Sequence, residues 1–181
     1  MASRSKALLF WPVLVAVVVS DAITKALAQR WLTLPELPHD VLGNAVRFTL
    51  VYNPGAAFGI SLGAYSRWIF MALTALALAI LARLYAATER GNVPRTLALA
   101  LVCGGALGNL MDRVWSGLGV VDFIDIGLRS ARWPTFNVAD VAVSTGAVLL
   151  AIVLWGEDRE ASAAASVSSP PMAERPAGEI S

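Results

Sequence analysis

Long apolar stretches, separated by shorter polar segments, run through most of the chain. Four of them approach the ~20 residues that a helix needs to cross a bilayer, and they cover residues 7–28, 68–87, 96–111 and 138–155. The third is short and is followed at once by Asp112 and Arg113, so its end must be polar or buried in protein. The pattern predicts a mainly α-helical membrane protein whose four spans form one bundle.

A different pattern between the first two spans predicts a strand. Apolar residues alternate with other residues, a period of two that is typical of β-structure, at Val46, Phe48, Leu50 and Tyr52. The alternation ends at a turn sequence, Asn53-Pro54-Gly55. We therefore expect a small sheet that rests on the membrane surface.

The first span has a second interpretation, as a signal peptide that is removed. Basic residues precede its apolar core, and residues 26–28 resemble a cleavage site. Removal would discard Asp21 and Lys25, which are four residues apart and therefore lie on one helical face, with the acid in the more favourable N-terminal position. This organised pair favours a helix that is retained.

Composition supports the membrane assignment and excludes other classes. Of 181 residues, 57% are hydrophobic and 15% charged, and the mean hydropathy is +0.64, whereas soluble domains average about 45–50% apolar and about 25% charged residues. A net charge of +1 gives no electrostatic basis for nucleic-acid binding. The lone Cys103 excludes an internal disulfide, and with His39 as the single histidine a histidine-ligated zinc site is not expected.

Charge and composition give a provisional topology. The basic residues divide evenly, seven on each side of the predicted bundle, but Arg4 and Lys6 favour a cytoplasmic N-terminus. An even number of spans then places both ends in the cytoplasm. Residues 1–156 are expected to form one membrane domain, and residues 157–181, rich in Ser, Ala, Pro and Glu, to form a disordered cytoplasmic tail.

Polar residues in apolar surroundings are the candidates for function, because charged groups near hydrocarbon are costly. All map to the outer half of the predicted bundle, and they are Asp21, Lys25, Asn53, Asn109, Asp112, Arg113, Asp122, Asn137 and Asp140. Structural interpretations stay open: Asp21 and Lys25 could be a buried ion pair, Asp112 and Arg113 a surface salt bridge, and the whole set packing contacts between helices.

Asp122 and Asp140 suggest acid–base chemistry. Two close carboxylates cannot both ionise, so one can hold a proton while the other acts as a base, as in aspartyl peptidases. No motif supports a serine nucleophile. Two alternatives remain on this reasoning: a small proton-coupled carrier that uses intramembrane carboxylates, and a non-catalytic membrane scaffold. Separation along the chain does not by itself place the two side chains in contact.

Five motifs, in order and at characteristic separations, resemble one family. They are DAITK at 21–25, YNPGAAFG at 52–59, GGALGNLMDR at 104–113, VVDFID at 120–125 and FNVAD at 136–140. The chain resembles bacterial lipoprotein signal peptidase, also called signal peptidase II, over about residues 7–156. The resemblance implies a multi-pass enzyme of the cytoplasmic (inner) membrane, with four transmembrane helices, a small periplasmic β-cradle, a short periplasmic helix or loop, and an active site near the periplasmic face.

The resemblance also implies an activity and roles for the candidates. The family removes signal peptides from prolipoproteins by cleaving before the diacylglyceryl-modified cysteine, without a metal or other cofactor. By motif position, Asp122 and Asp140 are the catalytic dyad, Asn53, Asn109, Arg113 and Asn137 hold substrate or orient the dyad, and Asp21, Lys25 and Asp112 support them. Expected partners are the prolipoproteins, membrane lipid and globomycin-type inhibitors, and one bundle suffices as a monomer.

Overall fold

A computed structural model describes residues 6–32, 37–57, 60–61 and 63–168. Its four long helices are α1 (Ala7–Trp31), α2 (Ser66–Ala87), α3 (Val93–Trp115) and α4 (Val138–Ser168). Each is long and apolar enough to cross a membrane. The prediction of a four-helix membrane bundle is therefore confirmed.

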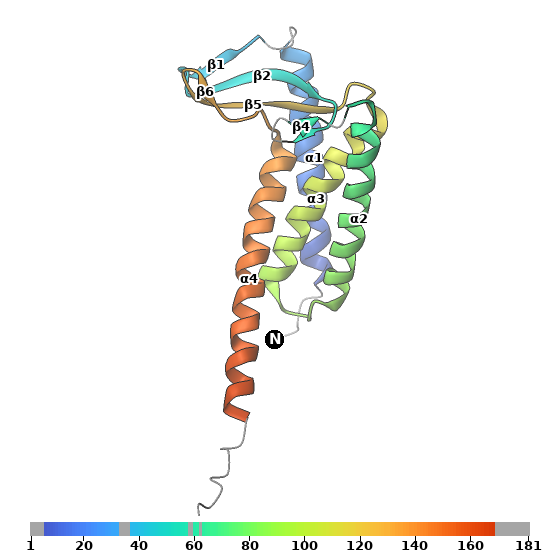
Figure 1. The fold of residues 1–181 in the computed structure, drawn as a ribbon, viewed down its shortest axis with the longest axis vertical. Helices are drawn as coiled ribbons and strands as arrows, with labels where there is room; N and C mark the ends of the chain where they lie inside the picture. Colours follow the sequence, from blue (N-terminus) through green and yellow to red (C-terminus); the bar gives the residue numbers. More distant parts are fainter. Residues whose placement is uncertain (1–5, 33–36, 58–59, 62, 169–181) are drawn as a thin grey trace, which may run out of the picture.

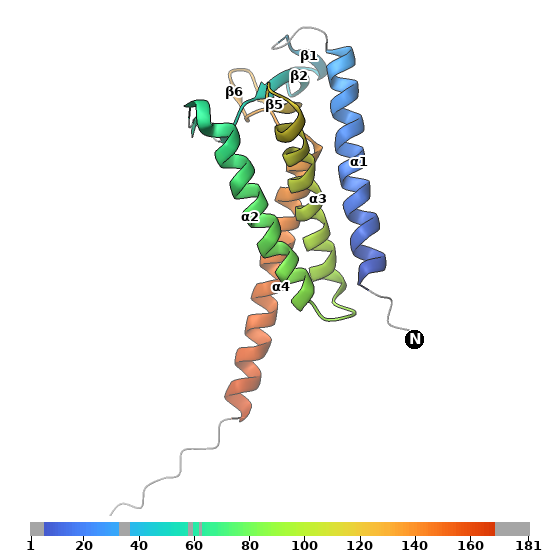
Figure 2. The same cartoon turned by 90° about the vertical axis from the view of Figure 1, so that its right-hand side faces the viewer.

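Helix α3 is the centre of the bundle and packs against α1, α2 and α4 (Figures 1 and 2). Glycines on α3 allow its neighbours to approach closely, as small residues do in membrane helix pairs. A Cβ atom at Gly105 would lie 2.3 Å from the Ala139 carbonyl oxygen of α4, and one at Gly108 would lie 2.6 Å from Asp21 Oδ2 of α1. The backbone of α3 thus brings α1 and α4 together at the level where the candidate residues lie.

The first helix is an integral part of this bundle. Phe10 and Leu14 of α1 belong to the same buried cluster as Leu99 of α3 and Leu81 of α2. Near its other end, Asp21 and Lys25 are 1% and 3% exposed. These contacts favour the retained helix over a removable leader.

A four-stranded antiparallel sheet lies across the end of the bundle where α1 ends and α4 begins (Figure 1). Its order is β1-β2-β5-β6, with β1 at His39–Leu42, β2 at Val46–Asn53, β5 at Val120–Leu128 and β6 at Ala131–Arg132. A two-stranded sheet of β3 (Ala56–Ala57) and β4 (Ile60–Ser61) and a 3-10 turn, η1 (Gly63–Tyr65), precede α2. The expected small sheet is present.

The alternation predicted for β2 is only partly correct. The pairing of β2 with β5 shifts register between Phe48 and Val51. Such an irregularity changes which face the side chains occupy, so the neighbours Thr49 and Leu50 are both buried, whereas Phe48 is 38% exposed. Leu50, with Val121 and Phe123 of β5, packs on the end of α1.

The last helix is longer than its predicted span. It continues to Ser168, so residues 157–168, expected to be disordered, are helical. Residues 161–165 contain four alanines, the residue with the highest helix propensity, and no proline occurs between Pro134 and Pro170. The rest of the predicted tail, residues 169–181, and Arg4, used in the topology argument, lie outside the described residues.

Candidate active site

The two candidate carboxylates come from different elements. Asp122 is on β5, opposite Val51 of β2, and Asp140 is in the first turn of α4. Asp122 is 3% exposed, and Asp140 is half-buried. Asn137, which directly precedes α4, hydrogen-bonds with both residues.

Asn137 and Asp140 form a reciprocal cap at the start of α4. The backbone N–H of Asp140 donates to Asn137 Oδ1 at 2.9 Å, and the backbone N–H of Asn137 donates to Asp140 Oδ2 at 3.2 Å. This is the arrangement of a capping box, which satisfies N–H groups that a helix leaves free. The same geometry holds the Asp140 carboxylate at the positive end of the helix dipole.

The side-chain amide of Asn137 reaches from the cap to the other carboxylate. Its Nδ2 donates to Asp122 Oδ1 at 2.7 Å, to Asn109 Oδ1 at 3.1 Å and to the Val121 carbonyl oxygen at 3.3 Å. The side chain is fully buried. One amide therefore links Asp122 to the residues that hold Asp140.

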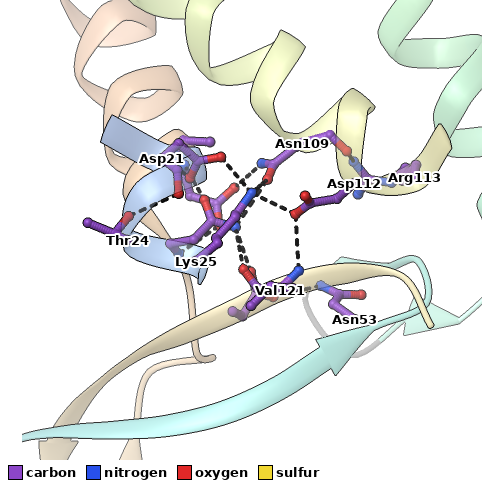
Figure 3. Close-up of polar contacts among 12 residues, drawn as sticks. Asp21, Thr24, Lys25, Asn53, Asn109, Asp112, Arg113 and Val121 are labelled. Atoms are coloured by element: carbon purple, nitrogen blue, oxygen red, sulfur yellow. Dashed lines mark hydrogen bonds and ion pairs between the residues drawn. The ribbon is translucent and has the colours of Figure 1, made fainter. Parts of the chain in front are cut away.

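Asn109 of α3 completes the link, and Lys25 sets its orientation (Figure 3). Asn109 Nδ2 donates to Asp140 Oδ1 at 2.7 Å, and its Oδ1 accepts from Lys25 Nζ at 3.0 Å. An ammonium group can only donate, so Lys25 requires the oxygen of this amide to face it. The NH₂ group of Asn109 must then face Asp140.

Lys25 is itself held by two carboxylates. Its Nζ lies 2.7 Å from Asp21 Oδ2 and 2.8 Å from Asp112 Oδ2. Asp21 Oδ1 accepts from the backbone N–H of Ala139 at 2.9 Å, and Asp112 Oδ2 accepts from that of Val121 at 3.2 Å. The three charged groups thus join α1 and α3 to the segments that carry Asp122 and Asp140. The interpretation of Asp112 and Arg113 as a surface salt bridge is wrong, because Asp112 forms its ion pair with Lys25.

Asn53 contacts Asp122, and Arg113 contacts Asn109. Asn53 Nδ2 donates to Asp122 Oδ2 at 3.2 Å, and its Oδ1 accepts from the Gly55 backbone at 3.0 Å. Arg113 donates to the Asn109 carbonyl oxygen at 3.2 Å and lies 5.5 Å from the Phe70 ring centroid. Among the described residues, its buried Nε has no hydrogen-bond partner. Residues 58 and 59 of the neighbouring motif lie outside the described residues.

The environment of Asp122 favours its protonated form. Burial, and then the negative charge of Asp140, raise its pKa to about 7, against the opposing effect of hydrogen bonds from Asn53 and Asn137 and the charge of Lys25. A carboxyl that titrates near neutrality can exchange a proton with a substrate.

Asp125, on the same strand, has a different environment. Arg47 donates to its Oδ2 at 2.8 Å, Thr49 donates to the same oxygen at 3.0 Å, and Arg132 binds its Oδ1. Burial raises the pKa of Asp125, but the hydrogen bonds from Arg132, Arg47 and Thr49 outweigh it and hold the pKa below its ordinary value. Asp125 therefore acts as a structural counter-ion. No group of three or more His, Cys, Asp or Glu side chains in the described part of the chain is arranged to hold a metal ion.

The structure brings together all nine sequence-predicted candidates and adds main-chain groups that sequence reasoning missed. Val121 contributes both its N–H and its carbonyl oxygen to the network, and Ala139 contributes its N–H. The glycine repeat of α3 was a usable signal, since it indicates a close helix contact. Nothing in the type of residue at positions 121 and 139 marks their backbone groups.

Comparison with known proteins decides the family. A protein-family model described as Signal peptidase (SPase) II, of peptidase family A8, matches residues 13–156 of this chain. The chain belongs to the signal peptidase II family. A protein named lipoprotein signal peptidase in Teredinibacter turnerae is 41% identical over 147 residues, 80% of this chain and 85% of the relative. One of the same name in Mycolicibacterium smegmatis is 41% identical over 83% of this chain and 68% of its own length.

Solved structures agree with this signal peptidase II fold. Two chains, each described as a bacterial membrane enzyme structure obtained by the in meso method, match with TM-scores of 0.73 and 0.71. The first is 28% identical to this chain, and the match covers 92% of this chain and 94% of the solved one. The second is 31% identical, and the match covers 81% of this chain and 92% of the solved one. The predictions of a multi-pass membrane protein and of a peptidase are confirmed, and the comparisons give no support for a carrier.

Proposed function

We propose that this signal peptidase II removes signal peptides from prolipoproteins by cleaving the bond before a diacylglyceryl-modified cysteine, with Asp122 and Asp140 as its catalytic pair. The relatives' name, lipoprotein signal peptidase, supports the substrate class. One observation carries the catalytic assignment: Asn137 hydrogen-bonds with both carboxylates, with Asp122 through its side chain and with Asp140 through its backbone N–H.

The surroundings of the two carboxylates suggest separate roles. Asp122 has a pKa raised to about 7 and suits the acid that begins the reaction protonated. Asp140 accepts hydrogen bonds from the Asn109 side chain and from the backbone N–H of Asn137 at the start of α4, and we assign it the role of base. Asn53, Asn109 and Asn137 orient the carboxylates, Arg113 offers a cation to the peptide carbonyl, and Asp21, Lys25 and Asp112 hold the assembly.

The reaction then proceeds as general acid–base hydrolysis. Asp140 takes a proton from water as the water oxygen bonds to the peptide carbonyl carbon, while Asp122 protonates the carbonyl oxygen. In the resulting tetrahedral intermediate, Asp122 recovers the proton from one hydroxyl, and Asp140 transfers its proton to the amide nitrogen. The carbon–nitrogen bond breaks, which leaves a carboxyl group on the signal peptide and a free amine on the lipidated cysteine.

The proposal includes a location. The enzyme lies in the bacterial inner membrane with both ends in the cytoplasm, and its sheet and dyad lie at the periplasmic face. Lys6, at the opposite end of the bundle from the sheet, agrees with the positive-inside rule. Membrane lipid surrounds the helices, globomycin-type inhibitors block the dyad, and a monomer is the working unit.

Amide substitutions of the two carboxyls test the assignment. We expect Asp122→Asn and Asp140→Asn each to slow conversion of lipidated prolipoprotein by about 10²–10⁴-fold, the usual contribution of general acid–base catalysis. Conversion is followed on a gel with purified protein in detergent. Asp40→Asn is the control, because it removes an exposed carboxyl from strand β1 of the same sheet, outside the network, and should keep turnover. Near-normal turnover by either dyad variant would refute the assignment.

A further inference from the structure

A hollow of about 300 Å³ opens beside Asp140 on the outer side of α4. Its lining contains aromatic, aliphatic and hydroxyl side chains, from Trp133, Phe136, Asp140, Val141, Ser144 and Thr145. Helix α4 packs against α3 and α1 on its other side. The hollow therefore connects the candidate active site with the lipid that surrounds the bundle.

Two hydroxyl groups on this surface have no hydrogen-bond partner among the residues that the structure describes. Ser144 and Thr145 are exposed on a membrane-spanning segment, and neither hydroxyl donates a hydrogen bond to any residue that the structure describes. By contrast, the hydroxyls of Thr74 and Thr96 in α2 and α3 bond to the carbonyl oxygens four residues earlier. A hydroxyl in an apolar medium gains free energy from an acceptor, so this pair is suited to a ligand that presents acceptors from the lipid side.

The depth of the hydroxyls narrows the choice of ligand. At 1.5 Å per residue, Ser144 lies about 6 Å below Asp140 along the helix axis. Trp133, at the upper edge of the hollow, is 63% exposed, and exposed tryptophan is typical of the membrane–water interface. The hollow thus spans the boundary between headgroups and hydrocarbon, where the ester groups of a glycerolipid lie.

On the proposed function, the lipid is attached to the residue directly after the scissile bond. When that bond lies at Asp122 and Asp140, the glyceryl group is only a few bonds beyond the cysteine sulfur. Its distance from the scissile bond is then about the length of one helical turn. We infer that the hollow binds the glyceryl ester part of the substrate. The Ser144 and Thr145 hydroxyls donate to its ester carbonyl oxygens, and Trp133 and Phe136 flank the beginning of the acyl chains.

Paired substrates test this inference, which rests on the proposed function. Two lipopeptides are compared, identical except that one carries ester-linked chains and the other carries ether-linked chains without carbonyl oxygens. We expect wild type to have a KM about fivefold lower for the ester, as two modest hydrogen bonds in a membrane setting would give. The double variant Ser144→Ala, Thr145→Val should show equal KM values for both, with kcat unchanged.

A hydroxyl elsewhere provides the control. Ser20→Ala removes an exposed hydroxyl from the membrane-spanning part of α1, outside the hollow, and should keep the fivefold difference. The inference is wrong if the double variant retains the wild-type ester-to-ether ratio, or if its KM rises equally for both lipopeptides. Failure of wild type to cleave either lipopeptide would instead contradict the proposed function, so the two failures are distinguishable.

Discussion

Asn137 allows a sharp test because one substitution keeps its shape and changes its charge. Asn137→Asp retains an oxygen that can accept from the Asp140 backbone, so the cap of α4 survives. The other end of the side chain changes from a donor to an anionic acceptor, directly opposite Asp122 Oδ1. We expect a folded protein whose activity depends on protonation of the introduced carboxyl.

The size of the expected loss of activity in Asn137→Asp follows from the geometry. Where Asp122 is ionised, two unit charges at the observed 2.7 Å separation repel by about 6 kcal/mol at an effective dielectric constant of about 20. Where Asp122 is protonated, an ionised carboxylate at position 137 accepts that proton in a hydrogen bond and withholds it from the substrate. Protonation is cheaper, because a carboxyl with an ordinary pKa of about 3.9 takes up a proton at pH 7 for about 4 kcal/mol. The protonated carboxyl can donate to Asp122 as the amide does. The expected loss is therefore about 10³-fold at pH 7 and shrinks about tenfold for each pH unit below it.

The assay is kcat/KM for a lipidated substrate from pH 5 to 8, expressed as the ratio of variant to wild type. Asn137→Ala is the matched control, since it removes the cap and the donor but adds no titratable group. Its ratio should be low and should not increase as the pH falls, because loss of the Asn137 hydrogen bond raises the pKa of Asp122 and moves only the alkaline limb, to higher pH. A constant or falling ratio for Asn137→Asp as the pH decreases would refute the link between Asn137 and Asp122.

Two further substitutions test other parts of the network. Asn53→Ala removes a hydrogen bond that lowers the pKa of Asp122, so that pKa should rise further above its ordinary value. Since the proposed mechanism uses Asp122 as the protonated acid, the alkaline limb of the pH–rate profile should move to higher pH, and an unmoved limb would contradict this role. Lys25→Met leaves the buried Asp21 and the half-buried Asp112 without their cation and should lower the free energy of unfolding by about 3–5 kcal/mol. Thermal unfolding in detergent measures this loss of stability. Lys25→Arg keeps the positive charge and should lose less stability than Lys25→Met. Equal losses in the two variants would show that the missing charge is not the cause.

Much of the architecture could be predicted from the sequence because it depends on local patterns. Span length and apolar composition identify membrane helices directly, and motif order identified the candidate residues. The errors arose where a local pattern was insufficient. The β2 alternation changes phase at a register shift that depends on β5, and helix α4 continues through residues 157–168, whose polar composition had suggested disorder.

The connections within the site could not be predicted from the sequence. Asp21 bonds to the backbone of Ala139, 118 residues away, and Lys25 bonds to Asn109, 84 residues away. Such pairs depend on how the helices pack and on backbone groups that carry no sequence signal. The direction in which Asn109 and Asn137 turn their amides follows only from the complete set of donors and acceptors.

The cap of α4 also bears on when this enzyme becomes active during its synthesis. Asp140 takes its position from the first turn of the last helix in the chain. A nascent chain that has inserted only its first three helices and the sheet carries Asp122 but has no second carboxylate beside it. In the proposed mechanism, packing of the fourth helix against the bundle then supplies both the second reactive carboxyl, Asp140, and the Asn137 amide that aligns Asp122. Completion of membrane insertion would thus be the activating event, and a half-made enzyme would be harmless to neighbouring proteins.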